Sequence, residues 1–123
     1  LQLQGGETIA IFGQGPVGLS ATQLATAMGA KVIALDISPE RLEMATAFGA
    51  AEIINASSND PVSAIRELTH GEGAHKTLEA SSAPSARQAA VQAVRSLNPG
   101  HPWSNLARAH EALGNKMAAF DAA

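Results

Sequence analysis

Along the first 95 positions of this 123-residue chain, short runs of apolar residues alternate with segments in which apolar residues recur at helical spacing. Short apolar runs closed by glycine or polar residues are typical of buried strands, and they occupy residues 8–12, 31–36, 52–54 and 76–80. Segments with apolar residues at helical spacing follow these runs, at residues 17–28, 39–48, 61–68 and 84–95. This alternation of strands and helices predicts an α/β fold with a parallel sheet.

Local signals mark where several of these helices begin and end. Ser38 suits an N-cap with Pro39 at the first helical position, while Gly29 and Gly49 stand where helices end in a left-handed residue. In the first helix, the apolar residues at helical spacing predict the face that packs on the sheet. These residues are Val17, Ala21, Leu24, Ala25 and Met28.

The first turn between strand and helix carries a glycine motif. Residues 13–18, Gly-Gln-Gly-Pro-Val-Gly, match G-x-G-x-x-G directly after a strand and before a helix. Gly13 permits the tight turn, Gly15 lets a pyrophosphate approach the backbone, and Gly18 lets the helix and strand pack closely. The bound anion then faces the unpaired N–H groups at the helix start. The motif predicts a dinucleotide site, and the alternative is a glycine-rich turn without a ligand.

An acidic residue follows the second strand at the spacing that this kind of site requires. Asp36 lies 18 residues beyond Gly18, where a carboxylate can accept hydrogen bonds from the ribose hydroxyls of an adenosine. Its negative charge would repel a 2′-phosphate, which favours NAD over NADP. Arg41 leaves the question open, because an arginine close to this strand accepts the 2′-phosphate in some NADP enzymes.

Composition and charge exclude several other classes of protein. Of the 46% hydrophobic residues nearly half are alanine, and aromatic residues make up 3%, which argues against an all-β sandwich. The net charge of −3, with Lys and Arg scattered along the chain, gives no footprint for nucleic acid. The chain has no apolar run long enough for a membrane span, and it has no cysteine for disulfides or thiolate zinc sites. We therefore expect a cytoplasmic protein without nucleic-acid or membrane partners.

Four segments resemble the coenzyme domain of zinc-type, medium-chain alcohol dehydrogenases, and they are residues 13–19, 29–36, 38–42 and 48–50. The Gly-Pro-Val-Gly form of the glycine turn is typical of that family, and the similarity extends from about residue 5 to 95. The resemblance implies a Rossmann fold with strand order 3-2-1-4 for the four strands present. It also implies NAD as the cofactor.

The same resemblance assigns roles to individual residues. The pyrophosphate would lie against the glycine turn, at Gly13, Gly15, Pro16, Val17 and Gly18. Asp36 would hold the adenosine ribose, with Ile37 and Arg41 around the adenine. Residues 80–82 would lie at the cofactor crevice beyond the fourth strand.

The chain also departs from that family. The catalytic domain with its cysteine and histidine zinc ligands is missing, as are the fifth and sixth strands of the full fold. The four histidines show no metal-ligand spacing, so we expect no zinc and no catalytic residues. This chain alone is therefore expected to be inactive as a dehydrogenase.

The pattern changes near residue 96. Residues 1–96 are predicted to form a truncated Rossmann domain, and residues 97–123 a helical hairpin packed in the same globular unit. Trp103, Leu106, Ala107, Gly114 and Ala119 resemble the start of a tetratricopeptide repeat, and an amphipathic hairpin is the plainer interpretation. The change of pattern suggests a recombined or designed chimera. The fourth strand would then have an open edge, which either the tail covers or a second copy pairs with in a homodimer.

Two classes of function follow from the sequence. The first is an NAD-binding domain of alcohol dehydrogenase ancestry that holds the ADP part of the cofactor weakly. The second is a chimeric scaffold with no ligand or activity, in which the glycine turn is a remnant.

Overall fold

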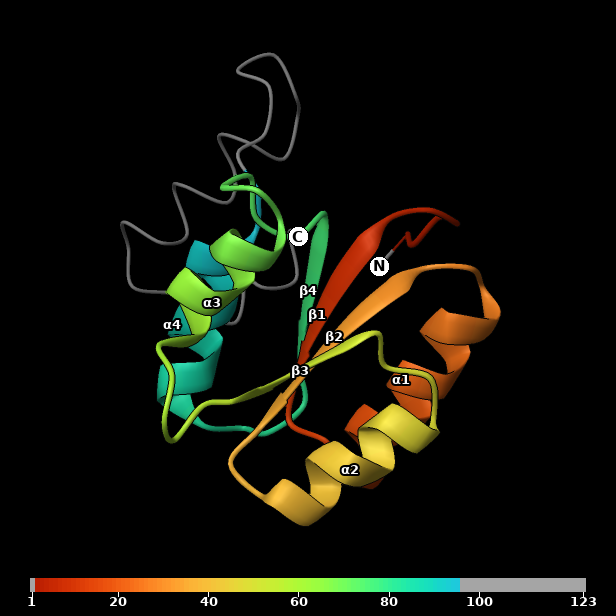
Figure 1. The fold of residues 1–123 in the computed structure, drawn as a ribbon, viewed down its shortest axis with the longest axis horizontal. Coiled ribbons are helices and arrows are strands. Elements are labelled where there is room, and N and C mark those ends of the chain that lie inside the picture. The colour runs from red at the N-terminus through yellow and green to blue at the C-terminus, as the bar shows by residue number, and fades with distance from the viewer. Residues whose placement is uncertain (1, 96–123) are drawn as a thin grey trace.

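The computed structural model describes residues 2–95, in which four strands and four helices alternate (Figure 1). The elements are β1 (Thr8–Phe12), α1 (Pro16–Ala27), β2 (Lys31–Asp36), α2 (Pro39–Ala47), β3 (Glu52–Asn55), α3 (Pro61–Leu68), β4 (Lys76–Glu79) and α4 (Pro84–Ala93). All strand pairs are parallel, and the strand order is β3-β2-β1-β4. The predicted fold class and strand order are confirmed.

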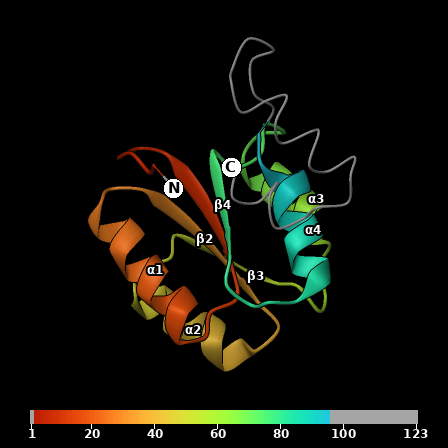
Figure 2. The same cartoon turned by 180° about the vertical axis from the view of Figure 1, so that it is seen from behind.

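Helices cover both faces of the sheet (Figures 1 and 2). The α1 and α2 helices lie on one face, and α3 and α4 lie on the other. Alternate residues of the central strand β1 point to opposite faces, so Ile9 and Ile11 pack beneath α1 while Ala10 and Phe12 pack beneath α3 and α4. The small side chain of Ala10 and the alanines of α4 let these layers approach closely.

The predicted inner face of α1 is only partly correct. Ala25 is buried and Ala21 packs against the core, but Val17, Leu24 and Met28 are 70%, 64% and 46% exposed. The residues that α1 buries are Gly18, Thr22 and Ala25, all of them small. The helix lies close to the sheet at Gly18, where there is no room for a side chain, and Leu19 is a larger apolar residue of α1 that does pack against the core, half-buried.

The predicted helix ends are confirmed at several positions. The hydroxyl of Ser38 accepts a hydrogen bond from the backbone N–H of Arg41, so Ser38 is the N-cap of α2. After α1 and α2, the backbone of Gly29 and Gly49 takes φ values of +87° and +115°. These left-handed conformations favour glycine and end each helix.

The end of α4 differs from the prediction, because the helix stops at Ala93 rather than near residue 95. Val94 is extended and forms a parallel bridge with Ala74, beside the start of β4. The Ala74 N–H donates to the Ala93 carbonyl at 3.0 Å, and the Arg95 N–H donates to the Ala74 carbonyl at 2.7 Å. These two bonds pull the chain out of the helix and toward the edge of the sheet.

Within residues 2–95 no strand pairs with the outer edge of β4, and the bridge at Ala74 lies before that strand begins. The homodimer through that edge therefore stays a prediction. The predicted helical hairpin at residues 97–123, and with it the tetratricopeptide resemblance, lies outside the described residues.

Candidate functional site

The site lies where the carboxyl ends of the parallel strands meet. A cavity of about 700 Å³ opens there between the sheet and the starts of α2, α3 and α4. Its walls include Gly13, Gly15, Asp36, Ile37 and Arg41 of the predicted site. In an open α/β sheet, ligands bind in the crevice outside these strand ends.

The three glycines of the motif differ in the space that a side chain would find at each position. Gly13 has a φ of +94°, and a Cβ on it would lie 2.8 Å from the backbone nitrogen of Ser81. A Cβ on Gly18 would overlap the carbonyl group of Gly13, with 2.7 Å to its carbon atom. A Cβ on Gly15 would meet nothing within 4 Å, so the space in front of Gly15 is open. Two of the glycines therefore hold the turn together, and the third leaves room for a ligand.

The start of α1 faces this open space. Gly15 is the N-cap and makes no side-chain capping bond, and Pro16 occupies the first helical position. The first helical hydrogen bond runs from the Leu19 N–H to the Gly15 carbonyl, so the N–H groups of Val17 and Gly18 come before it. The helix start therefore offers donors and a positive dipole end to an anion.

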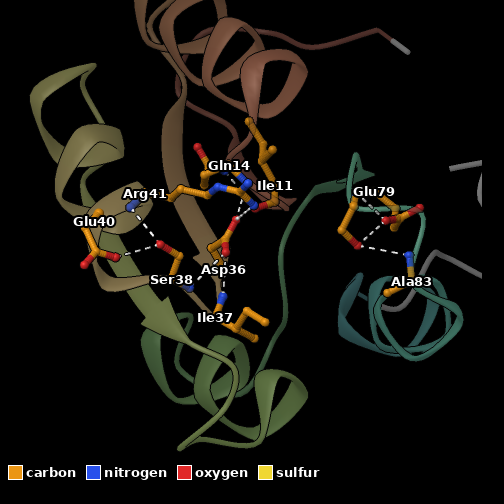
Figure 3. A network of polar contacts seen from close by, with 10 residues as sticks. Ile11, Gln14, Asp36, Ile37, Ser38, Glu40, Arg41, Glu79 and Ala83 are labelled. Carbon is orange, nitrogen blue, oxygen red and sulfur yellow. Dashed lines mark hydrogen bonds and ion pairs between the residues drawn. The ribbon is translucent and has the colours of Figure 1, made fainter.

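Asp36 ends β2 and lies at the centre of a polar network (Figure 3). Its side chain is 5% exposed. One carboxylate oxygen accepts the N–H of Gln14 at 2.7 Å, and the other accepts those of Ile37 at 2.7 Å and Ser38 at 3.0 Å. The guanidinium of Arg41 stands 3.9 Å from the oxygen that Gln14 contacts. The backbone thus fixes the carboxylate beside the glycine turn.

Ile37 and Arg41 frame the outer side of the same carboxylate. Ile37 is 68% exposed, and the side chain of Arg41 is 59% exposed. An exposed apolar side chain beside a guanidinium suits one face of a flat aromatic ring. Five of the predicted site residues therefore line one crevice, together with Ala80 and Ser81 from the predicted stretch 80–82. Pro16, Val17 and Gly18 do not line it, because they lie at the start of α1, where Val17 is exposed and Gly18 packs against Gly13.

A second acidic residue, next to the crevice residues Ala80 and Ser81, was not identified as part of the site from the sequence. The Glu79 carboxylate, at the end of β4, accepts the backbone N–H groups of Ser81 and Ser82, both at 2.6 Å. Arg87 stands 3.9 Å from the other oxygen of Glu79. This turn forces Ser82 into a left-handed conformation with φ of 63°, and it sets Ser81 against Gly13.

Gln14 is another residue that the sequence did not single out. Its side chain is fully buried, although it belongs to the turn. The amide nitrogen donates to the Ile11 carbonyl at 3.1 Å, and the amide oxygen accepts the Thr22 hydroxyl at 2.8 Å. A glutamine in a glycine-rich turn gives no sequence signal of burial, because its partner lies eight residues away on α1.

The two histidines within the described region lie away from this crevice. His75 precedes β4, and its ring nitrogen Nδ1 accepts the backbone N–H of Thr8 at 3.0 Å. Within residues 2–95, no group of three or more acidic or histidine side chains is placed to hold a metal ion. No helix in this part of the chain combines the length and the apolar character that a membrane span requires.

Comparison with known proteins gives one consistent result. Residues 16–97 match the family model described as zinc-binding dehydrogenase. The chain is 43% identical over 95 residues to sorbitol dehydrogenase of Bacillus subtilis, covering 76% of this chain and 27% of that enzyme. It is 36% identical over 118 residues to an alcohol dehydrogenase of Cupriavidus necator, covering 95% of this chain and 31% of that enzyme.

The solved structure of an alcohol dehydrogenase from Thermus sp. ATN1 matches with a TM-score of 0.73 and 42% identity, over 76% of this chain and 27% of that one. The chain thus spans less than a third of the length of these relatives. The match to the Cupriavidus necator enzyme continues beyond residue 96, and the comparisons give no support for a chimera or for a tetratricopeptide repeat. The fold, the glycine turn and these matches together place the chain in the zinc-binding dehydrogenase family, in the region that corresponds to its coenzyme-binding domain.

Proposed function

We propose that this chain binds NAD, chiefly through the ADP part of the cofactor. The observation that carries the proposal is the position of Asp36, whose buried carboxylate is held 2.7 Å from the glycine-turn N–H of Gln14. The pyrophosphate would occupy the open space at Gly15, against the backbone of Gly13, Pro16, Val17 and Gly18. The ribose would donate to Asp36, and the adenine would lie between Ile37 and Arg41.

The geometry at Asp36 also supports NAD rather than NADP. A 2′-phosphate on the ribose would come close to a carboxylate that is nearly withdrawn from solvent, where like-charge repulsion is weakly screened. Arg41 already faces Asp36 at 3.9 Å, so its charge is partly offset by that carboxylate. Binding of the 2′-phosphate would require Arg41 to leave Asp36 with its negative charge uncompensated.

In this proposal the chain supplies binding and orientation without chemistry of its own. When bound, the nicotinamide ring of NAD accepts or donates a hydride. The residues described here hold the adenosine and pyrophosphate, and the proposal assigns none of them to the nicotinamide. We therefore expect weak binding and no dehydrogenase activity from this chain alone.

Titration of the 123-residue protein with NAD, AMP and ADP-ribose tests the proposal, followed by calorimetry and by the amide NMR signals of residues 13–18. We expect NAD and ADP-ribose to bind with similar affinity, because both carry the ADP part. Asp36→Ala should weaken NAD binding by about 1–3 kcal/mol, the loss typical of hydrogen bonds to a charged group. Glu67→Ala is the matched control, since it removes an exposed carboxylate on α3.

Two results would contradict the proposed NAD site. If no amide signal of residues 13–18 moves at millimolar NAD, the protein is a scaffold without this ligand. If Asp36→Ala binds NAD as tightly as Glu67→Ala, NAD is held elsewhere.

A further inference from the structure

The buried residue Gln14 joins three elements of the site, two through its side chain and one through its backbone N–H. Its amide nitrogen contacts the end of β1 through the Ile11 carbonyl, at 3.1 Å. Its amide oxygen accepts a hydrogen bond from Thr22, which lies inside α1 and is fully buried. Its backbone N–H donates to the Asp36 carboxylate at 2.7 Å. Gln14 therefore links the strand, the helix and the acidic residue at one point of the turn, and its contacts with Ile11 and Asp36 can be seen in Figure 3.

The Gln14 side chain has no free group with which to contact a ligand. Both ends of the amide are bonded to protein atoms, and the residue has no exposed surface. A buried glutamine would cost stability if either end lacked a partner, so the position suits this residue only because Ile11 and Thr22 are in place. Its effect on a ligand must act through the backbone.

We infer that Gln14 is a positioning residue for the nucleotide, and that the Thr22 hydroxyl holds it in place. This inference rests on the proposed function. The two side-chain bonds fix the orientation of the Gln14 peptide, and that peptide aims its N–H at Asp36. The same restraint keeps Gly13 and Gly15, its direct neighbours, in the conformation that leaves the anion space open. A turn ordered before binding spares the ligand the cost of ordering it.

Two substitutions at Thr22 separate positioning from packing. Thr22→Val keeps the shape of the side chain and removes the hydroxyl, whereas Thr22→Ser keeps the hydroxyl and removes a methyl group. If the hydroxyl positions the turn, Thr22→Val should weaken NAD and ADP-ribose binding about five- to tenfold, the range for one lost hydrogen bond. Thr22→Ser should then bind within about twofold of the unchanged protein. A purely packing role predicts the reverse order, because valine fills the site and serine leaves a gap.

The chain contains a matched control for loss of a buried threonine hydroxyl. Thr77 in β4 is 1% exposed, and its hydroxyl has no hydrogen-bond partner among the described residues. Thr77→Val should therefore leave NAD affinity unchanged and should not lower the melting temperature. Circular dichroism of each variant establishes that it is folded before binding is compared.

A measurement without ligand makes the inference independent of the proposed function. In the ligand-free protein, Thr22→Val should shift the amide NMR signals of Gln14 and Gly15 and speed the hydrogen exchange of the Gln14 N–H, while Thr77→Val should not. Failure of the unchanged protein to bind NAD would overturn the proposed function. Unchanged Gln14 and Gly15 signals in Thr22→Val, or NAD affinities in which Thr22→Ser is the weaker variant, would overturn the inference about Gln14.

Discussion

The glycine turn offers a prediction in which two substitutions of the same kind have opposite effects. A methyl group on Gly18 would overlap the Gly13 carbonyl, whose carbon would be 2.7 Å away. Those atoms belong to the backbone and cannot rotate aside, so β1 and α1 must separate. Gly15 differs, because its φ of −73° suits alanine and a Cβ there would meet nothing within 4 Å.

The expected cost of Gly18→Ala can be worked out from these contacts. Overpacking of a tight site costs about 1–3 kcal/mol, and backbone overlap puts this case near the upper end. Alanine regains about 1 kcal/mol over glycine inside a helix, which leaves a net loss of about 2 kcal/mol. For a domain of this size the melting temperature should fall by roughly 8–16 °C. Gly15→Ala should cost less than about 1 kcal/mol, the value for a poorer N-cap.

Thermal unfolding followed by circular dichroism, together with NAD titration, measures both effects. Gly18→Ala should melt far below Gly15→Ala. Gly15→Ala should stay folded and lose NAD affinity, because its methyl group would occupy the space proposed for the pyrophosphate. Equal melting temperatures for the two variants would refute the packing role of Gly18, and unchanged NAD affinity in Gly15→Ala would refute the position of the anion.

Two further predictions concern residues outside the glycine turn. Ser82→Gly should raise the free energy of unfolding, measured in urea, by about 0.5–1 kcal/mol. The change removes the steric strain of a left-handed serine at φ of 63°, and the greater flexibility of glycine in the unfolded chain cancels only part of that gain. Ser85→Gly, inside α4, should instead lower the free energy of unfolding. The hydroxyl and the backbone N–H of Ser63 hold the pKa of Asp60, the N-cap of α3, below its usual value of 3.8. The ionised Asp60 cap therefore stabilises the protein above pH 3.8, and this stabilisation is lost as the pH falls below that value. In Asp60→Asn the acid unfolding curve should lack this pH-dependent loss. Identical acid unfolding curves for the two proteins would contradict the role of Asp60.

Sequence patterns were sufficient for the framework because they depend on local signals. The parallel α/β fold follows from short apolar runs that alternate with helical segments, whereas the strand order comes from the resemblance to the dehydrogenase family. The start of α2 was predictable because the Ser38 cap involves only Ser38 and Arg41, three residues apart. The face of α1 could not be predicted in the same way. Periodicity counts apolar residues, whereas the distance between α1 and the sheet selects small ones such as Gly18 and Thr22.

The candidate site shows the same division between local and distant causes. Gly13, Gly15, Gly18 and Asp36 could be identified because their spacing along the chain carries the chemistry. The role of Gln14 depends on contacts with three other elements, and the role of Glu79 depends on how β4 sits against the glycine turn. Such residues become visible only when the packing is known.

The central position of β1 has a consequence for synthesis of the protein. This strand leaves the ribosome first among the elements described, yet one of its two partners, β4, begins only at Lys76. At about 5–20 residues per second, the nascent chain carries an unpaired edge with the apolar residues Ile9 and Ile11 for several seconds. A chain interrupted before Lys76 would keep that edge exposed and would be prone to aggregate. The interval before β4 emerges is therefore the stage of synthesis at which protection by a chaperone matters most.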